Sequence, residues 1–282
     1  AQPEKKVEKT FEAKDKIKMK FALGDCSLAP SKDGRIHVTL TYMYEKGTFT
    51  PVMEERGSRL YLEEDFASGT RNAGDGYSIW SLAVPPETRI EFKTGTGGLE
   101  IKGLGSDIEA STGTGNIEVT DASGEFDLST GTGNITMTGT EGEFELSSGT
   151  GRVRITNCSG RFDAGSGTGR VRAENINIEM KADFSCGTGS AEVTGIKGNG
   201  YDLSISSGTG TAELDLDGAV LNAFVEMKCG EPAGTIRSDF PFDTEKVYEE
   251  RGNSYELKTL KKGTAENRIE IHTGTGTAKL KK

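Results

Sequence analysis

The sequence predicts an all-β protein built as a parallel β-solenoid, and three observations support this prediction. A Gly-Thr-Gly motif recurs along the chain at a nearly constant interval. Between its copies, apolar and polar residues alternate with the period of two that is typical of strands. Glycine is abundant, at 39 of 282 residues, which is about twice its usual share. Fixed self-similarity of this kind indicates stacked structural units.

The spacing of the motif predicts coils of about 18–22 residues, which lies in the range of solenoid repeats. The interval between successive first glycines is constant at first, then lengthens slightly, and only the last interval is much longer. Cys229-Gly230 is a degraded copy inside that last interval. The first glycines of the intact copies are Gly95, Gly113, Gly131, Gly149, Gly167, Gly187, Gly208 and Gly274.

Each unit is predicted to contain two short strands joined by tight turns. In one unit, Ile117 and Val119 alternate with polar residues, and Phe126 and Leu128 do the same after a turn. One such unit cannot bury its apolar side alone, so equivalent strands are expected to stack at about 4.8 Å into two parallel sheets. Glycine accepts a positive φ and close backbone approach. The motif is therefore expected to form the corner of every coil.

The ends of the chain lack this regularity. We expect an N-terminal β cap with irregular coils over residues 1–93, the regular solenoid over 94–235, and a C-terminal cap with the last coil over 236–282. Solenoids need atypical caps because open parallel edges invite association. All three segments are expected to form one structural domain. A separate N-terminal sandwich is the alternative.

Charge and hydropathy exclude some partners and leave others open. The net charge is −10 and mean hydropathy is −0.51. An acidic body repels phosphate backbones, so nucleic acid is a poor partner. No apolar run approaches the roughly 18 residues of a membrane helix. The beginning, "AQPEKK", is typical of a mature N-terminus after removal of a signal peptide before Ala1, which predicts an exported protein.

The order of segments resembles a known family. An alternating N-terminal region is followed by "YSIWSLAVPPETRIEFKTGTGGLEI", by repeated TGTG motifs, by "GTIRSDFPF" and by a last "IEIHTGTGTAKL". This order is similar to the bacterial "putative adhesin" family of unknown function found in Bacteroidetes, and to the head domain of "putative" autotransporter adhesins. The resemblance spans roughly Phe11 to Leu280. It implies a right-handed β-helix located in the periplasm or at the cell surface, and it transfers no catalytic or ligand residue.

Motifs for catalysis, cofactors and metals are not found in the sequence. The glycine-rich corners lack the Lys-Ser/Thr and the following helix of a phosphate loop, and the repeat lacks the Gly-Gly-x-Gly-x-Asp pattern of calcium-binding coils. His37 and His272 are interpreted as ordinary strand side chains. Minimal turns leave no walls for the cleft of a polysaccharide-active enzyme. We therefore expect no catalytic residue, no cofactor and no metal.

Threonines and cysteines also occupy repeated positions at the corners. Threonines on both sides of the corner glycine, such as Thr112 and Thr114, resemble the face of an ice-binding solenoid, but hydrogen-bonded stacking within the corner is the simpler interpretation.

Cys186 and Cys229 both precede a corner glycine, with Ser207 expected in the coil between them. Two coils separate them by about 9.6 Å, too far for a disulfide. All four cysteines, Cys26, Cys158, Cys186 and Cys229, are predicted to be free and mostly buried.

The candidate binding site is a square of arginines on the outward face. The repeat interval places Arg152 and Arg154 next to Arg170 and Arg172 on an otherwise acidic chain. Arginine binds planar anions such as carboxylate and phosphate. The square predicts an anion site, for acidic polysaccharide or lipopolysaccharide phosphate, and the alternative for it is a solvated face neutralised by Glu192 and its neighbours. Together with the family resemblance, it predicts a non-catalytic envelope protein, an adhesin or surface binding module for acidic glycans or other anions. The alternative hypotheses are a scaffold that contacts envelope proteins and, more remotely, an enzyme or an ice-binding protein.

Overall fold

The structure is a computed structural model that describes residues 3–67 and 76–282. The expected mature N-terminus at Ala1 lies outside these residues. The described chain is all-β and contains no helix, so no helix in it is long and apolar enough to span a membrane. It divides into two compact units, Ala1–Gly133 and Asn134–Lys282. Each unit is described separately below.

The described part of the first unit contains twelve strands arranged in two ladders. One ladder has the order β5–β6–β2–β8–β10–β12. The other has the order β1–β4–β7–β3–β9–β11. Their bounds are β1 (Lys5–Phe11), β2 (Lys16–Phe21), β3 (Asp25–Pro30), β4 (Ile36–Met43), β5 (Phe49–Arg56), β6 (Arg59–Phe66), β7 (Tyr77–Val84), β8 (Arg89–Thr96), β9 (Leu99–Lys102), β10 (Ile108–Thr114), β11 (Ile117–Thr120) and β12 (Ser123–Thr132).

The second unit contains nine strands, most of them paired in parallel. β13 pairs with β14, β14 with β15, β15 with β16, and β16 with β21. β17, β20 and β19 follow on one side, the last two in antiparallel pairs. Their bounds are β13 (Ile135–Thr138), β14 (Glu141–Thr156), β15 (Ser159–Lys197), β16 (Asp202–Asp215), β17 (Ala223–Gly230), β18 (Thr235–Ser238), β19 (Thr244–Glu250), β20 (Asn253–Lys261) and β21 (Asn267–Lys281).

The repeat is visible in the register of the parallel pairs. In the first unit, Ile108 pairs with Ile90 and with Phe126, which lie at equal offsets before and after it in the chain. In the second unit, Glu141 pairs with Ser159 at the same offset. Equivalent side chains therefore lie in columns across neighbouring strands.

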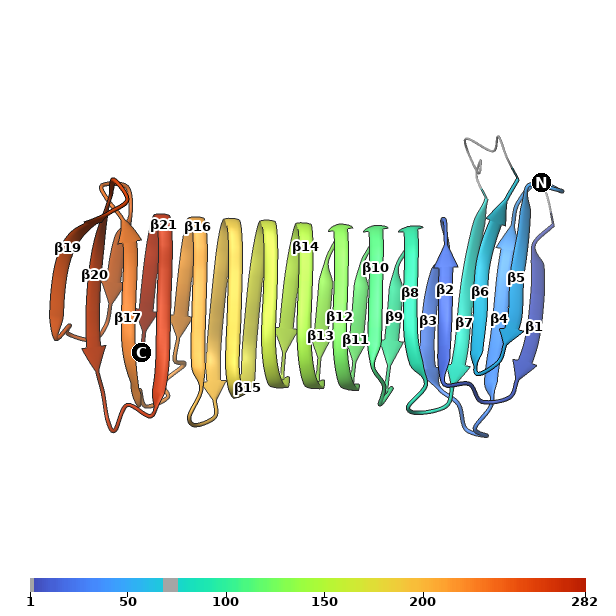
Figure 1. The fold of residues 1–282 in the computed structure, drawn as a ribbon, viewed down its shortest axis with the longest axis horizontal. Coiled ribbons are helices and arrows are strands. Elements are labelled where there is room, and N and C mark those ends of the chain that lie inside the picture. The colour runs from blue at the N-terminus through green and yellow to red at the C-terminus, as the bar shows by residue number, and fades with distance from the viewer. Residues whose placement is uncertain (1–2, 68–75) are drawn as a thin grey trace. The chain divides into compact units, whose positions relative to one another are not determined.

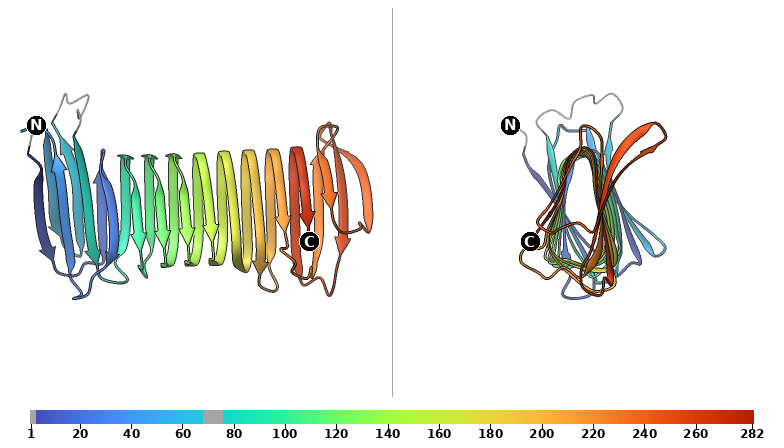
Figure 2. Two further views of the ribbon diagram at one scale, coloured as in Figure 1. Left: turned by 180° about the vertical axis from the view of Figure 1, so that it is seen from behind. Right: turned by 90° about the vertical axis from the view of Figure 1, so that its left-hand side faces the viewer.

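Stacking order differs from chain order in both units. In the first unit, β2 lies between β6 and β8, and β3 lies between β7 and β9. In the second unit, β21 lies between β16 and the pair β17 and β18, as Figure 1 shows from one side and Figure 2 from behind. The first and last parts of the chain thus include internal strands. Among the described strands, the sheet edges are β1 and β5 in one unit and β18 and β19 in the other.

The core consists of the predicted inward-facing positions. Val153 and Ile155 are fully buried, as are Val171 and Ala173 on the neighbouring coil. The alternation predicted for the two strands of every sequence repeat is confirmed, since the inward-facing residues of these strands are between 0% and 3% exposed. Burial of a column of apolar side chains is the main source of stability in such a stack.

The corner glycines are required by close backbone contact. A Cβ at Gly167 would lie 2.7 Å from the carbonyl oxygen of Gly149, and a Cβ at Gly131 would lie equally close to that of Gly113. The second glycine of the motif also has a positive φ, for example +149° at Gly169. Each repeated corner therefore lies in close backbone contact with the corner before it, which explains the recurrence of the motif.

The cysteine prediction is confirmed, although one step of its argument is wrong. Cys26, Cys158, Cys186 and Cys229 are all free and buried. Ser207 pairs with Cys186, but Thr273, and not Cys229, is its other neighbour. Cys229 pairs with Thr273. Three strand spacings therefore separate the two thiols, because β21 is inserted between β16 and β17.

Candidate functional site

The four predicted arginines lie on two adjacent strands of the second unit. In β14 and β15, the inward positions are taken by Val153, Ile155, Val171 and Ala173, all fully buried. The side chains between them must face outward. The register pairs Arg152 with Arg170 and Arg154 with Arg172. The structure thus brings the four residues together into what we call the arginine square.

Glu174 bridges one side of the arginine square. Its two carboxylate oxygens lie 2.9 Å from the Nη2 atoms of Arg154 and Arg172. The hydrogen bond from Arg154, with the charge of Arg172, holds the pKa of Glu174 below its ordinary value. Arg172 Nε is buried without a hydrogen-bond partner. Like charges stacked across strands are unfavourable, and Glu174 offsets part of this repulsion.

The other side of the square is less neutralised. Arg170 Nε donates to Ser190 Oγ at 3.0 Å and lies 3.6 Å from a carboxylate oxygen of Glu192. Among the described residues, the Arg152 side chain has no ion pair. Four guanidinium groups thus face two carboxylates, and the difference, four minus two, leaves a local excess of two positive charges. This excess lies on a chain of net charge −10.

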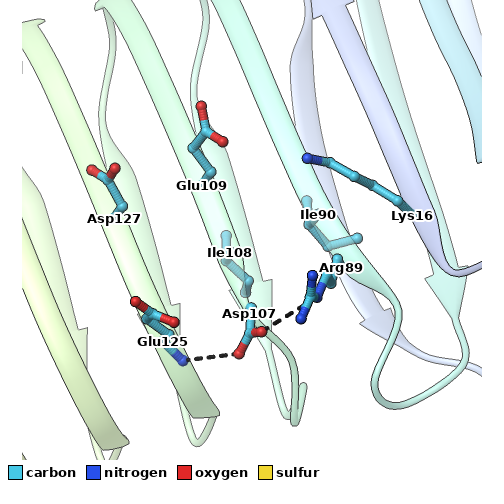
Figure 3. Close-up of a pocket in the computed structure, with 8 residues that line it drawn as sticks. All are labelled: Lys16, Arg89, Ile90, Asp107, Ile108, Glu109, Glu125 and Asp127. Carbon is cyan, nitrogen blue, oxygen red and sulfur yellow. Dashed lines mark hydrogen bonds and ion pairs between the residues drawn. The ribbon is translucent and has the colours of Figure 1, made fainter.

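A second feature is a polar hollow in the first unit. It has a volume of about 290 Å³ and lies over β2, β8, β10 and β12. Figure 3 shows Arg89 facing Asp107, whose carboxylate lies 3.5 Å from the guanidinium and also accepts from the Glu125 amide at 3.4 Å. Lys16, across the hollow, is paired with Glu91 at 2.8 Å. Within the described ranges, no group of three or more His, Cys, Asp or Glu side chains could hold a metal ion.

The corner threonines divide into a buried and an exposed row. Thr112 and Thr130, which precede the corner glycine, are 2% and 4% exposed. Each hydroxyl donates to a corner carbonyl at 3.0 Å, from Thr112 to Gly97 and from Thr130 to Gly115. The threonine that follows the glycine, such as Thr114, is exposed. Only one threonine row per corner faces solvent, so the paired array typical of ice-binding faces is not formed.

The side chain of His37 forms hydrogen bonds with two residues that the sequence pattern does not connect with it. Its Nε2 lies 2.9 Å from the carboxylate of Asp33, and its Nδ1 lies 3.1 Å from Thr10 Oγ1. The hydrogen bond from His37 lowers the pKa of Asp33. Both side chains of the ion pair are about half exposed, at 42% and 50%. Water screens such a chain of hydrogen bonds, and it lacks the desolvation that activates a nucleophile.

Comparison with known proteins places the chain in a family. The Toastrack DUF4097 family matches residues 14–281, nearly the whole chain. The chain belongs to the Toastrack DUF4097 family. A search of curated proteins gave no match for this Toastrack chain.

Several solved structures are similar to this Toastrack chain at low identity. A "putative adhesin" from Bacteroides fragilis NCTC 9343 has 14% identity and a TM-score of 0.39, covering 99% of this chain and 98% of that one. A "putative adhesin" from Parabacteroides distasonis ATCC 8503 has 12% identity and a TM-score of 0.40, covering 99% and 97%. A "putative cell adhesion protein" from Clostridium sporogenes ATCC 15579 has 15% identity and a TM-score of 0.28, covering 99% of both chains.

One site residue of the Toastrack chain could have been found from its sequence. Glu174 is the next outward position after Arg172 in the same strand, so the alternation that located the arginines also locates their counter-ion. Glu192 lies two residues after Ser190 on the same outward face and forms an ion pair with Arg170. The chain of Thr10, His37 and Asp33 has no such signal, because it depends on the antiparallel pairing of β1 with β4.

Proposed function

We propose that this Toastrack protein is a non-catalytic binding module of the bacterial cell envelope that holds acidic polysaccharide on the arginine square. The observation that carries the proposal is the excess of two positive charges on the square, given the net charge of −10. A patch of opposite sign on an acidic body attracts anions locally, whereas the rest of the surface repels them. Export to the periplasm or cell surface is part of the proposal.

The square suits a flat polyanion better than a small ligand. Its arginines project from paired strands, so their spacing is set by the backbone at about 4.8 Å across the strands. Because the paired strands already fix the backbone, only the arginine side chains lose conformational freedom on binding. Guanidinium groups bind carboxylates with two parallel hydrogen bonds. We infer a right-handed solenoid, with coils of about 18–22 residues forming one domain, as the frame that holds the array.

A structural scaffold is the second candidate, and the ion pairs favour it. Arg154, Arg170 and Arg172 each contact a glutamate, which reduces the charge available to a ligand. Surface ion pairs of this kind also occur on faces that bind nothing. A scaffold would contact envelope proteins and would show no saturable polysaccharide binding.

Binding to polygalacturonate, measured by titration calorimetry at low and physiological salt, tests the proposal. We expect saturable binding that weakens with salt, and about tenfold weaker binding, about 1.4 kcal/mol, when Arg152, Arg154, Arg170 and Arg172 are all replaced by alanine. Neutral dextran should not bind.

A matched pair of double variants locates the site. Arg152→Ala with Arg170→Ala removes one side of the square. Arg161→Ala with Arg268→Ala removes two outward arginines of the same unit that lie outside it. Equal loss in both doubles would contradict a localised site. Absence of binding by the unaltered chain would favour the scaffold.

A further inference from the structure

An apolar hollow of about 810 Å³ opens in the second unit, away from the arginine square. Its volume lies in the range of small-molecule sites, about 300–1,000 Å³. One wall is the loop between β16 and β17, in which Val220 is 92% exposed and Leu221 is 7% exposed. Phe240 and the turn at Lys262 form the other walls. Val220 and Leu221 thus contribute apolar surface to one rim of the hollow.

Hydrogen bonds hold the walls of the hollow in place. The Asn222 side-chain oxygen accepts from Thr264 Oγ1 at 3.1 Å and from the Ala265 amide at 3.0 Å, which joins two of the walls. Asn267 Nδ2 donates to the Asn222 carbonyl oxygen at 2.9 Å. On the third side, the Lys282 amide donates to Asp239 at 3.1 Å. A site that is already formed loses less affinity to ordering.

The charged side chains that line the hollow are two lysines, Lys262 and Lys282, and no lining side chain is acidic. The nearby Asp239 carboxylate accepts a hydrogen bond from the Lys282 amide. Within the described chain, neither lysine ammonium group forms an ion pair, whereas nearby Lys279 is paired with Glu213 at 3.2 Å. Lys282 Nζ lies 5.4 Å from the centre of the Phe240 ring. The hollow therefore combines an apolar lining with two ammonium groups available to an anion.

We propose that this hollow binds a single anionic amphiphile, with its acyl chain against Val220, Leu221 and Phe240 and its acidic head between Lys262 and Lys282. The combination of apolar lining and unpaired cations fits this class, because a neutral chain leaves the lysines unused and a small hydrophilic anion leaves the apolar surface exposed. The site is independent of the arginine square, so the two proposals can fail separately.

Titration with a fluorescent palmitate analogue, below its critical micelle concentration, tests the site. Saturable binding at one site per chain is expected, with about tenfold weaker affinity for Val220→Asp and for Lys262→Glu. Val247→Asp and Lys246→Glu in β19 are matched controls, because Val247 is also exposed, at 59%, and neither residue lines the hollow. Circular dichroism should show that all four variants fold, since the altered side chains lie at the surface.

Three outcomes would overturn the proposal. The first is no saturable binding by the unaltered chain. The second is equal affinity for the matching neutral alcohol, which would remove the role of the lysines. The third is binding only to vesicles of anionic phospholipid, unaffected by Val220→Asp, which would assign the interaction to a membrane surface and not to the hollow.

Discussion

The repeated corners and the corner between β2 and β3 make the same bend by different means. In the repeats, a buried hydroxyl donates to the carbonyl of the neighbouring corner, as Ser166 does to Gly151 at 3.0 Å. Between β2 and β3 there is no Gly-Thr-Gly motif. Instead, the amides of Ala22 and Leu23 donate to the carboxylate of Glu64 at 2.8 and 3.0 Å. One kind of corner is stabilised by its own copies and the other by a side chain of the adjacent strand β6.

This difference shows two ways of satisfying backbone groups at a bend. A repeated corner needs no specific partner, because each copy supplies the acceptor for the next. The irregular corner depends on Glu64, which also accepts from Trp80 Nε1 at 2.9 Å and from Ser78 Oγ at 2.5 Å. Its stability is concentrated in one carboxylate. The repeats should therefore be sensitive to added volume, and the irregular corner to a lost acceptor.

The largest effect is expected from Gly169→Ala. Its new Cβ would overlap the carbonyl oxygen of Gly151, at a backbone φ of +149° that alanine rarely adopts. We expect a loss of more than about 3 kcal/mol of unfolding free energy, measured by urea denaturation followed by circular dichroism. Gly200→Ala is the control, since φ is +67° there but no atom lies within 4 Å of the new Cβ. It should cost about 1–2 kcal/mol, and equal losses would contradict steric stacking of the corners.

The second-largest loss of unfolding free energy is expected from Glu64→Ala. It leaves the amides of Ala22 and Leu23 and the indole N–H of Trp80 without their acceptor. Unpaired donors cost about 1–3 kcal/mol when buried, so we expect a total loss of about 2–4 kcal/mol. Trp80 is the only tryptophan and is fully buried, so its emission reports on this corner.

The neighbouring Asp65→Ala is the control for that variant. Asp65 is exposed, and its removal should change stability by less than about 0.5 kcal/mol. If Glu64→Ala unfolds at the same urea concentration as Asp65→Ala, with unchanged Trp80 emission, the carboxylate is not the element that holds this corner.

The smallest effect is a pH dependence that tests the insertion of β2 beside β8. Lys16 and Lys18, each 2.8 Å from the Glu91 carboxylate, lower its pKa to about 2. The unfolded chain has a pKa of about 4.3 at this residue. Because the folded pKa is lower, the stabilisation is complete above about pH 4.5 and is lost as the pH falls toward 2.

Glu91→Gln should flatten this part of the stability curve, as followed by thermal unfolding between pH 2 and 6. Glu109→Gln, in the adjacent strand, should leave it nearly unchanged, because among the described residues Glu109 forms an ion pair with Lys93 only, at 3.1 Å, and its side chain is 49% exposed. An unaltered acid limb in Glu91→Gln would show that the ion pairs of Glu91 with Lys16 and Lys18 do not stabilise the contact between β2 and β8.

Much of this protein is determined by its sequence. The alternation identified the buried columns, including Ile117 and Val119, because period-two burial is a local property of a strand. The motif spacing identified the corners and placed the four arginines side by side, because equal coil lengths keep equivalent residues in register. Glu174 follows from the same rule.

Only the tertiary structure decided the order of strands near the two ends of the chain. It also decided the side-chain contacts that follow from this order. The positions of β2 beside β8 and of β21 beside β16 follow from no repeat interval, and they set the contacts of Glu91 and Thr273. Backbone hydrogen bonds between strands are the same for any pair of sequences, so local pattern does not specify which edges meet. That choice is made by the packing of the whole chain.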